Sequence, residues 1–467
     1  MKRMHRRDFF SLCGAAAMAG VLPSGPRGTA AGAADKPASA PAGGAGRGPN
    51  IIFILTDDMG YGDVGCYGGT FARTPNLDKL AGEGTRLTQF YVASPICSPS
   101  RVACTSGMFP ARWRINNYLN TRKGNRETQQ ADFLDASAPS LARQLKQAGY
   151  ATAHFGKWHM GGGRDVTDAP PISAYGFDEW ASTWESPNPA EDPAKKDKLP
   201  RWQRTAFWAD KTIDFLRRHK GQPCYVNLWP DDVHDPHVPS PQTVEKLGGK
   251  PAPRQKTAAT IEEYDAALGK LFDFLRGEGM EGSTLVVFTG DNGPQPSYEY
   301  ARTLGLRGQK WSLYEGGIRE PFIVKWKGHV PAGRVEERTV SCSVDLLPTL
   351  CRIAGAPLPA GAALDGMDAS KAWLGGSVQR GSDKALLWEY GRHGGYLRPK
   401  GEHDKSPNCA IREGNWKLLV NANGSGLELY DLAADPKETT NLAAANTEVA
   451  ERLKKRLLEW RQGLPKG

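Results

Sequence analysis

Four short apolar runs, each followed directly by polar or charged residues, constrain the fold of this chain more than any other feature. They cover residues 50–56 (NIIFILT), 150–155 (YATAHF), 224–229 (CYVNLW) and 284–289 (TLVVFT). Continuous apolar runs of this length are typical of parallel strands that are buried on both faces. The segments between them have helical periodicity, so we expect an α/β fold with a large, mostly parallel sheet and helices on both faces.

The pattern changes near residue 380. The segments LLWEYG, CAIREGNWKLLVNA and LELYDL alternate between apolar and polar residues and are joined by turns, several of them rich in glycine. This pattern predicts a small antiparallel sheet, followed by a helix over residues 448–460. We therefore expect a catalytic domain over residues 50–379 and a small C-terminal α+β domain over residues 380–467.

The N-terminal segment has the features of an export signal. A cationic start (MKRMHRRD) precedes a short apolar run and then small residues. Arg6 and Arg7, followed by Asp-Phe-Phe, resemble a twin-arginine signal, although an ordinary secretory signal with chance arginines is the alternative. We expect residues 1–34 to be this signal and 35–49 a flexible linker. Twin-arginine export machinery would then place the protein in the periplasm or outside the cell.

Charge and composition exclude some partners. The formal net charge is +9, and it falls to +5 without the predicted signal, which favours anionic substrates. We find no long basic tract and no helix-turn-helix or zinc-finger spacing, so we expect no nucleic acid partner. No run of apolar residues is long enough to span a membrane. The eight cysteines are sparse and show no disulfide framework.

Acidic and amide side chains follow two of the predicted strands. Asp57 and Asp58 come directly after the first run, and Asp291 and Asn292 come just after the fourth. Ligands of such sheets bind at the carboxyl ends of the strands, and oxygen donors of this kind select calcium or magnesium over zinc. Capping of the following loops is the alternative explanation.

The stretch CSPSRVACTSG (97–107) resembles the signature of the type I, arylsulfatase-like sulfatases, which have the alkaline-phosphatase-like fold. It matches the pattern Cys-x-Pro-x-Arg at every defined position. TDDMGYGD, GKWH, TGDNG, YEGGIREP and the terminal WKL…ELYDLAADPKETTNLA resemble the same family, in the same order. The resemblance runs from about residue 50 to 443.

The resemblance implies a nucleophile and a metal. In that family the motif cysteine, here Cys97, is oxidised to formylglycine by a maturation enzyme. A hydrated aldehyde offers one hydroxyl to attack sulfur and a second whose deprotonation releases sulfate, which a plain serine could not easily do. By resemblance, Asp57, Asp58, Asp291 and Asn292 bind Ca²⁺ together with the modified residue 97.

Four further residues match the family's catalytic set. Arg101 would lie in the first turn of a helix that begins after Pro99, where it would stabilise an anion. Lys157 would bind sulfate, and His159 would accept the proton whose removal triggers sulfate release. Lys310 would contact the sulfate and the bridging oxygen.

The acid that protonates the leaving oxygen is sought in HDPHVP, which contains His234 and His237. The family pattern His-x-Pro fits His237-Val-Pro239, so we expect His237 to be this acid. His234 would be a substrate contact or a loop cap.

Two segments outside these motifs have sugar-binding chemistry. Trp184 and Glu185 lie in the insertion after GKWH, and Arg392 and His393 lie where the small domain should meet the large one. Tryptophan faces stack on sugar rings, and charged groups pair with hydroxyls. We expect these four residues to bind a terminal sulfated sugar, although packing of Trp184 and a surface role for Arg392 are the alternatives.

The sequence therefore predicts an exported sulfatase (a sulfuric ester hydrolase) that hydrolyses sulfate monoesters, with sulfated carbohydrate as the expected substrate. A phosphodiesterase or phosphonate monoester hydrolase of the same superfamily is one alternative. A non-catalytic protein that binds sulfated glycans is another.

Overall fold

A computed structural model of the chain describes residues 48–184, 186–187, 192–196 and 198–466, which lie within one compact unit. The expected export signal (1–34) and nearly all of the expected linker (35–49) fall outside the described residues. In the part of the chain that is described, no helix is long and apolar enough to cross a bilayer.

The larger sheet in the described residues has nine strands. Their order is β4-β3-β5-β1-β6-β7-β2-β8, and β9 also pairs with β2. All neighbours from β4 to β6 are parallel, whereas β7 is antiparallel to both β6 and β2. The strands are β1 (Asn50–Thr56), β2 (Thr85–Tyr91), β3 (Ala151–Lys157), β4 (Glu179–Thr183), β5 (Cys224–Trp229), β6 (Thr284–Gly290), β7 (Arg319–Lys325), β8 (Arg334–Glu336) and β9 (Ser341–Cys342).

Both faces of the central strands are buried, as their continuous apolar sequence predicts. In β1, Ile51, Phe53 and Leu55 pack into one hydrophobic core, whereas Ile52 and Ile54 pack into another. Successive side chains of a strand point to opposite faces, so one apolar run supplies two cores. The predicted α/β class, with a mostly parallel sheet, is confirmed.

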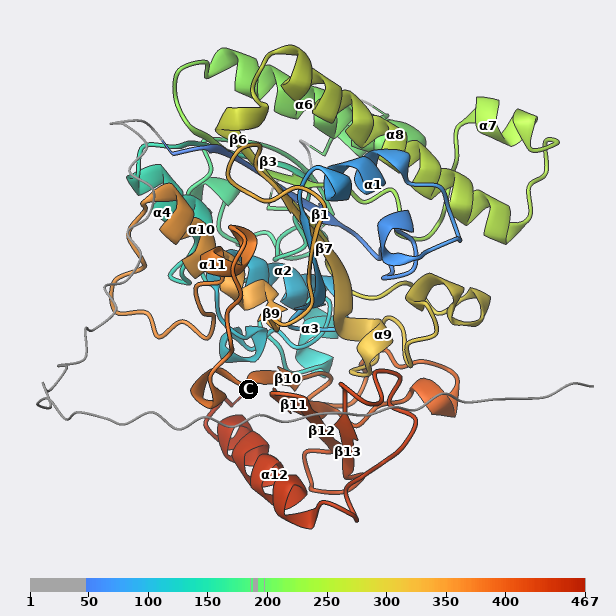
Figure 1. Ribbon diagram of the computed structural model, residues 1–467, viewed down its shortest axis with the longest axis vertical. Helices are drawn as coiled ribbons and strands as arrows, with labels where there is room; N and C mark the ends of the chain where they lie inside the picture. The colour runs from blue at the N-terminus through green and yellow to red at the C-terminus, as the bar shows by residue number, and fades with distance from the viewer. Residues whose placement is uncertain (1–47, 185, 188–191, 197, 467) are drawn as a thin grey trace, which may run out of the picture. The chain divides into compact units, whose positions relative to one another are not determined.

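Helices cover the two faces of this sheet. Helices α1, α6 and α8 contribute to the core that contains Ile52, and α2, α4 and α10 to the core that contains Ile51 (Figure 1). The helices are α1 (Pro75–Gly82), α2 (Cys97–Ser106), α3 (Arg122–Glu127), α4 (Leu141–Gln147), α5 (Pro193–Lys196), α6 (Arg204–Arg218), α7 (Pro241–Lys246), α8 (Pro253–Gly277), α9 (Glu315–Ile318), α10 (Leu346–Ala354), α11 (Ser370–Trp373) and α12 (Thr447–Gln462).

The C-terminal part forms the predicted small antiparallel sheet and final helix. Its four strands run in the order β10-β11-β12-β13. They are β10 (Leu386–Glu389), β11 (Cys409–Glu413), β12 (Trp416–Val420) and β13 (Glu428–Asp431). Residues of this sheet and of α12 belong to the same core as Ile51. The division of the chain at residues 379 and 380 remains a prediction.

Candidate active site

The acidic and amide side chains predicted at the sheet edge lie together. Strands β1 and β6 are parallel neighbours whose last residues are paired in register. Asp57 and Asp58 follow β1, Asp291 and Asn292 follow β6, and all four are fully buried. The topology of the sheet therefore brings two chain segments more than 200 residues apart to one point.

Two buried oxygens of this cluster have no hydrogen-bond partner. The backbone N–H of Asp58 donates to Oδ1 of Asp291 over 3.1 Å, and Nδ2 of Asn292 donates to Oδ1 of Asp58 over 2.7 Å. In contrast, Oδ1 of Asn292 accepts no hydrogen bond, and Oδ1 of Asp57 accepts none and has only Nη2 of Arg101 nearby, at 3.5 Å. Buried oxygens without donors are uncommon, and they fit the oxygen coordination of a hard cation.

Two buried lysines neutralise the first two carboxylates. Nζ of Lys157 lies 2.6 Å from Oδ2 of Asp57, and Nζ of Lys310 lies 2.7 Å from Oδ2 of Asp58. Burial raises the pKa of Asp57, but Lys157 and neighbouring basic groups outweigh burial and hold this pKa well below its usual value. Burial lowers the pKa of Lys310, but Asp58 outweighs it, so both groups are charged.

Helix α2 begins at Cys97 itself, three residues before Ser100, where we expected it to begin after Pro99. Proline is tolerated in the first turn of a helix because the N–H that it lacks has no intrahelical acceptor there. Arg101 therefore lies in the second turn rather than the first. It is fully buried, and it donates through Nη1 to the carbonyl of Lys157 (3.1 Å) and through Nη2 to Oδ2 of Asp291 (2.7 Å).

One cavity of about 210 Å³ collects four of the six predicted catalytic side chains, all except Arg101 and His237. Its predicted members are Cys97, Lys157, His159, Lys310 and His234, together with Trp184. Its remaining lining residues were missed from the sequence: Ile96, Tyr118, Arg164, Gln295, Trp311 and Leu397. Of these, only Ile96 and Trp311 directly adjoin a motif residue, and that adjacency is the one signal that could have found them.

The structure separates the two histidines of the loop that follows β5. His234 lines the cavity, and its Nε2 lies 3.7 Å from Oδ2 of Asp58. His237 is not among the residues that line it, and both of its ring nitrogens are engaged, Nε2 by the carbonyl of Val233 (2.9 Å) and Nδ1 by Oγ1 of Thr257 (3.1 Å). Burial and Arg302 lower the pKa of His237 to about 4. These positions favour His234 over His237 as the proton donor.

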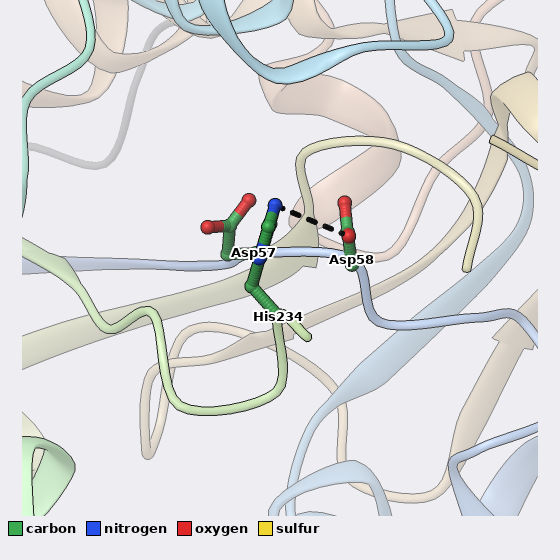
Figure 2. A group of neighbouring side chains, drawn as sticks. All are labelled: Asp57, Asp58 and His234. Carbon is green, nitrogen blue, oxygen red and sulfur yellow. Dashed lines mark ion pairs between the residues drawn. The ribbon is translucent and has the colours of Figure 1, made fainter. Parts of the chain in front are cut away.

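His234 also completes a group that could hold a metal. One ligand atom from each of Asp57, Asp58 and His234 lies within 4.8 Å of the others. Figure 2 shows the imidazole ring of His234 between the two carboxylates, with its ion pair to Asp58 dashed. We had not predicted a nitrogen donor at this edge, although His234-Asp235-Pro236 fits the pattern His-x-Pro as well as His237 does.

His159 follows β3 and faces the same cavity. Its Nε2 lies 3.2 Å from the carbonyl oxygen of Leu119. A carbonyl can only accept, so Nε2 carries the proton and Nδ1 is the basic nitrogen of the neutral ring.

Trp184 forms part of the cavity wall and is 40% exposed. Its indole N–H donates to Oδ2 of Asp231 over 2.9 Å, and Nζ of Lys157 lies 5.9 Å from the ring centre. The ring centre is also 6.4 Å from that of His234. The adjacent Glu185 lies outside the described residues.

Arg392 and His393 are not among the residues that line the cavity that contains Cys97. They line a second cavity, together with residues at and beyond the end of α12. The connection between β10 and β11, which includes both residues, reaches the first cavity through Leu397 instead.

Comparisons with known proteins show the family to which the chain is similar. A family model described as sulfatase matches residues 49–356, and one described as N-sulphoglucosamine sulphohydrolase, C-terminal, matches residues 308–463. N-acetylgalactosamine-6-O-sulfatase of Bacteroides thetaiotaomicron is 29% identical, over 87% of this chain and 91% of the relative. Human arylsulfatase A is 31% identical, over 87% of each chain.

Solved structures share the fold. A structure titled as Ps i-CgsB in complex with a neocarrahexaose has a TM-score of 0.73 and 26% identity, over 89% of this chain and 93% of that one. The matched sulfatase model covers residues 49–356, which include every residue that lines the cavity except Leu397. This chain therefore belongs to the type I, arylsulfatase-like sulfatase family and is a sulfuric ester hydrolase.

Proposed function

We propose that this sulfatase hydrolyses sulfate monoesters of carbohydrates in the cavity lined by Cys97, releasing an alcohol and sulfate. The observation that carries this proposal is the convergence of Cys97, Lys157, His159 and Lys310 on one cavity from three separate segments of the chain. A nucleophile position, anion-binding cations and a proton acceptor are the parts that sulfuryl transfer to an enzyme group needs.

Cys97 is the residue that we infer to become formylglycine, because it is the cysteine of the Cys-x-Pro-x-Arg motif. As a hydrated aldehyde, formylglycine would supply one hydroxyl to attack sulfur and a second whose deprotonation releases sulfate. Residue 97 is the first residue of α2, a ten-residue helix, and helix N-termini stabilise negative charge. This proposal requires a formylglycine-generating enzyme as a maturation partner.

The ligand set that we propose for Ca²⁺ is Asp57, Asp58, Asp291 and Asn292. The two unpartnered oxygens of Asp57 and Asn292 support it, and hard oxygen donors suit Ca²⁺. The ion would polarise the sulfate group and lower the pKa of the attacking hydroxyl. Burial and Asp57 hold the pKa of Asp291 well above its usual value, which a bound cation would reverse by stabilising the carboxylate.

Lys157 and Lys310 are the residues that we propose bind the sulfate group. Both ammonium groups are charged at the cavity wall, since nearby carboxylates hold the pKa of each lysine above its usual value despite burial. Arg101, held by Asp291, adds positive charge behind them. Oriented cations in a site that excludes water stabilise the charge of a transferring group without reorganisation.

Two histidines are placed for proton transfer at different points. Nδ1 of His159 would accept the proton whose loss triggers sulfate release, because its Nε2–H is held by Leu119. We propose His234, rather than His237, as the group that protonates the leaving oxygen. Burial and Lys310 lower the pKa of His234, but a bound anionic ester would raise it by stabilising the imidazolium.

Sulfated carbohydrate is the substrate class that the cavity wall supports best. Trp184 and Trp311 both line the cavity, and indole faces stack on sugar rings. The names of the bacterial relative and of the carbohydrate complex above refer to an acetylated amino sugar and a carrahexaose, respectively. The proposed export signal, with Arg6 and Arg7, would deliver the enzyme to the periplasm or beyond.

Activity assays discriminate this function from its alternatives. Protein co-expressed with a formylglycine-generating enzyme should hydrolyse 4-nitrophenyl sulfate faster than bis(4-nitrophenyl) phosphate. Cys97→Ala should abolish the hydrolysis of 4-nitrophenyl sulfate. Peptide mass spectrometry should show sulfur replaced by oxygen at residue 97, with loss of two hydrogens. Faster phosphodiester hydrolysis would favour the phosphodiesterase alternative, and sulfated-glycan binding without turnover would favour the binding protein.

A further inference from the structure

A second cavity, of about 560 Å³, lies beside the C-terminal end of α12. Its charged and polar lining residues are Gln129, Arg392, His393, Arg461, Gln462 and Lys466. Each of these side chains can donate hydrogen bonds, and none of the lining residues is a carboxylate. The volume is in the range of cavities that bind small ligands, so this lining is suited to an anionic one.

A buried carboxylate fixes two of the guanidinium groups. Glu389, at the end of β10, is only 3% exposed. Nε of Arg392 donates to both oxygens of Glu389 (3.0 and 2.9 Å), and its Nη1 donates to the carbonyl of Pro465 (2.6 Å). Nε of Arg461 lies 2.7 Å from Oε1 of Glu389. Two long basic side chains are therefore oriented before any ligand binds, which lowers the entropic cost of binding.

Positive charge remains in excess at this cavity. Arg392, Arg461 and Lys466 carry three positive charges, and Glu389 neutralises only one of them. Lys466 forms no ion pair with any residue that the structure describes. Nε2 of His393 is buried without a hydrogen-bond partner, so this nitrogen could also form a hydrogen bond with a ligand. Such an excess of oriented donors favours a sulfate or carboxylate group.

The second cavity is close to the catalytic one along the chain. His393 lines the second cavity, whereas Leu397, four residues later in the same connection, lines the cavity of Cys97. Four residues of extended chain span at most about 14 Å. Neighbouring sugars of one oligosaccharide can bridge such a separation.

We propose that the second cavity is an anion-binding subsite, which holds a sulfate or carboxylate group of the same glycan whose terminal sulfate ester is hydrolysed at residue 97. The inference relies on the proposed function for the chemical nature of the ligand. It assigns Arg461 and Lys466 a part in choosing multiply charged oligosaccharides over small sulfate esters.

The test compares two double variants on helix α12 and the segment after it. Arg461→Gln/Lys466→Ala removes two cations of the cavity, whereas Arg452→Gln/Lys455→Ala removes two exposed cations of the same helix and is the matched control. A chondroitin 6-sulfate tetrasaccharide is the multiply charged probe, and 4-nitrophenyl sulfate is the small one. Binding of the tetrasaccharide is measured by calorimetry in a Cys97→Ala background, which prevents turnover.

The cavity variant should bind the tetrasaccharide at least about tenfold more weakly than the control does, since it removes two cations and a single charge-assisted hydrogen bond is worth about tenfold in affinity. The ratio of kcat/KM for the tetrasaccharide to that for 4-nitrophenyl sulfate should fall by a similar factor. Equal binding by both variants would overturn the subsite. If the protein with an intact Cys97 hydrolyses no sulfate ester, but the cavity variant still binds the tetrasaccharide more weakly than the control, the subsite is supported and the proposed function is refuted.

Discussion

Separate alanine substitutions of His234 and His237 distinguish a proton donor from a structural histidine three residues further along the chain. In His237→Ala, two hydrogen bonds are lost, to Val233 and Thr257. Each is worth about 0.5–1.5 kcal/mol, so the free energy of unfolding should fall by about 1–3 kcal/mol. Because His237 is not among the residues that line the cavity, kcat should change little.

His234→Ala should have the opposite profile. The ring is 24% exposed, and its Nε2 is 3.7 Å from Asp58, too far for a hydrogen bond. Its Nδ1 lies 2.6 Å from the carbonyl oxygen of Asp235, so removal of the ring should cost one hydrogen bond, about 0.5–1.5 kcal/mol, against two for His237. A general acid contributes about 10²–10⁴-fold to rate, or about 3–5.5 kcal/mol of the barrier. That loss should appear with a sugar sulfate, whose alcohol leaves poorly, whereas 4-nitrophenyl sulfate should lose less than about tenfold, because nitrophenolate leaves without a proton.

The assay is kcat for both esters in both variants, together with thermal unfolding and the calcium content of each protein. A loss that depends on the leaving group in His237→Ala, but not in His234→Ala, would refute the assignment. Equal losses on both esters in His234→Ala, accompanied by loss of metal, would instead make His234 a metal ligand.

Three further expectations address the metal, the cavity wall and the buried ion pairs. Asp291→Ala should lose calcium and activity together, as measured by metal analysis and kcat; undiminished turnover after exhaustive chelation would contradict the site. Trp184→Phe keeps an aromatic ring at this position but loses the indole N–H and its hydrogen bond to Asp231. KM for a sugar sulfate should therefore rise more than kcat falls. Lys417 is fully buried, with its Nζ 3.0 Å from a carboxylate oxygen of Glu315 and 2.9 Å from one of Glu438. Its replacement by methionine should lower the free energy of unfolding by about 3–5 kcal/mol. Burial and Glu315 raise the pKa of Glu438 to about 7, whereas the unfolded chain loses this proton at lower pH. The free energy of unfolding, measured by chemical denaturation, should therefore fall as pH rises from about 4.5 to 7. Glu438→Gln should flatten this dependence on pH.

The strands of the large sheet that were predicted from the sequence are the ones with a continuous apolar run. The bounds expected for β1 and β5 agree with the structure, because nothing but a parallel central strand accounts for runs such as NIIFILT and CYVNLW. Strands β2 (TRLTQFY) and β7 (REPFIVK) were missed. Both contain charged residues among the apolar ones, and their antiparallel pairing depends on partners more than 200 residues away, which no local pattern can indicate.

The candidate metal site could be predicted once the parallel strands were recognised, because the carboxyl ends of parallel strands meet at one edge of the sheet. The choice between His234 and His237 was not, because both fit His-x-Pro and the path of the loop decides which ring reaches the cavity. A similar limit applies to the connection after β10. Arg392 and His393, which we expected to bind the sugar, line the second cavity, whereas Leu397 is the residue of this connection that lines the catalytic cavity.

The charges of the catalytic site explain why cation and substrate would need each other there. Three buried carboxylates face three buried basic groups, in the pairs Asp57 with Lys157, Asp58 with Lys310 and Asp291 with Arg101. A calcium ion bound by these carboxylates would compete with the lysines for the same oxygens and leave two positive charges uncompensated. One ionised nucleophile and one sulfate monoester supply two negative charges. The two lysines, released from the carboxylates, would then pair with sulfate, so binding of the cation and of the ester should each strengthen the other.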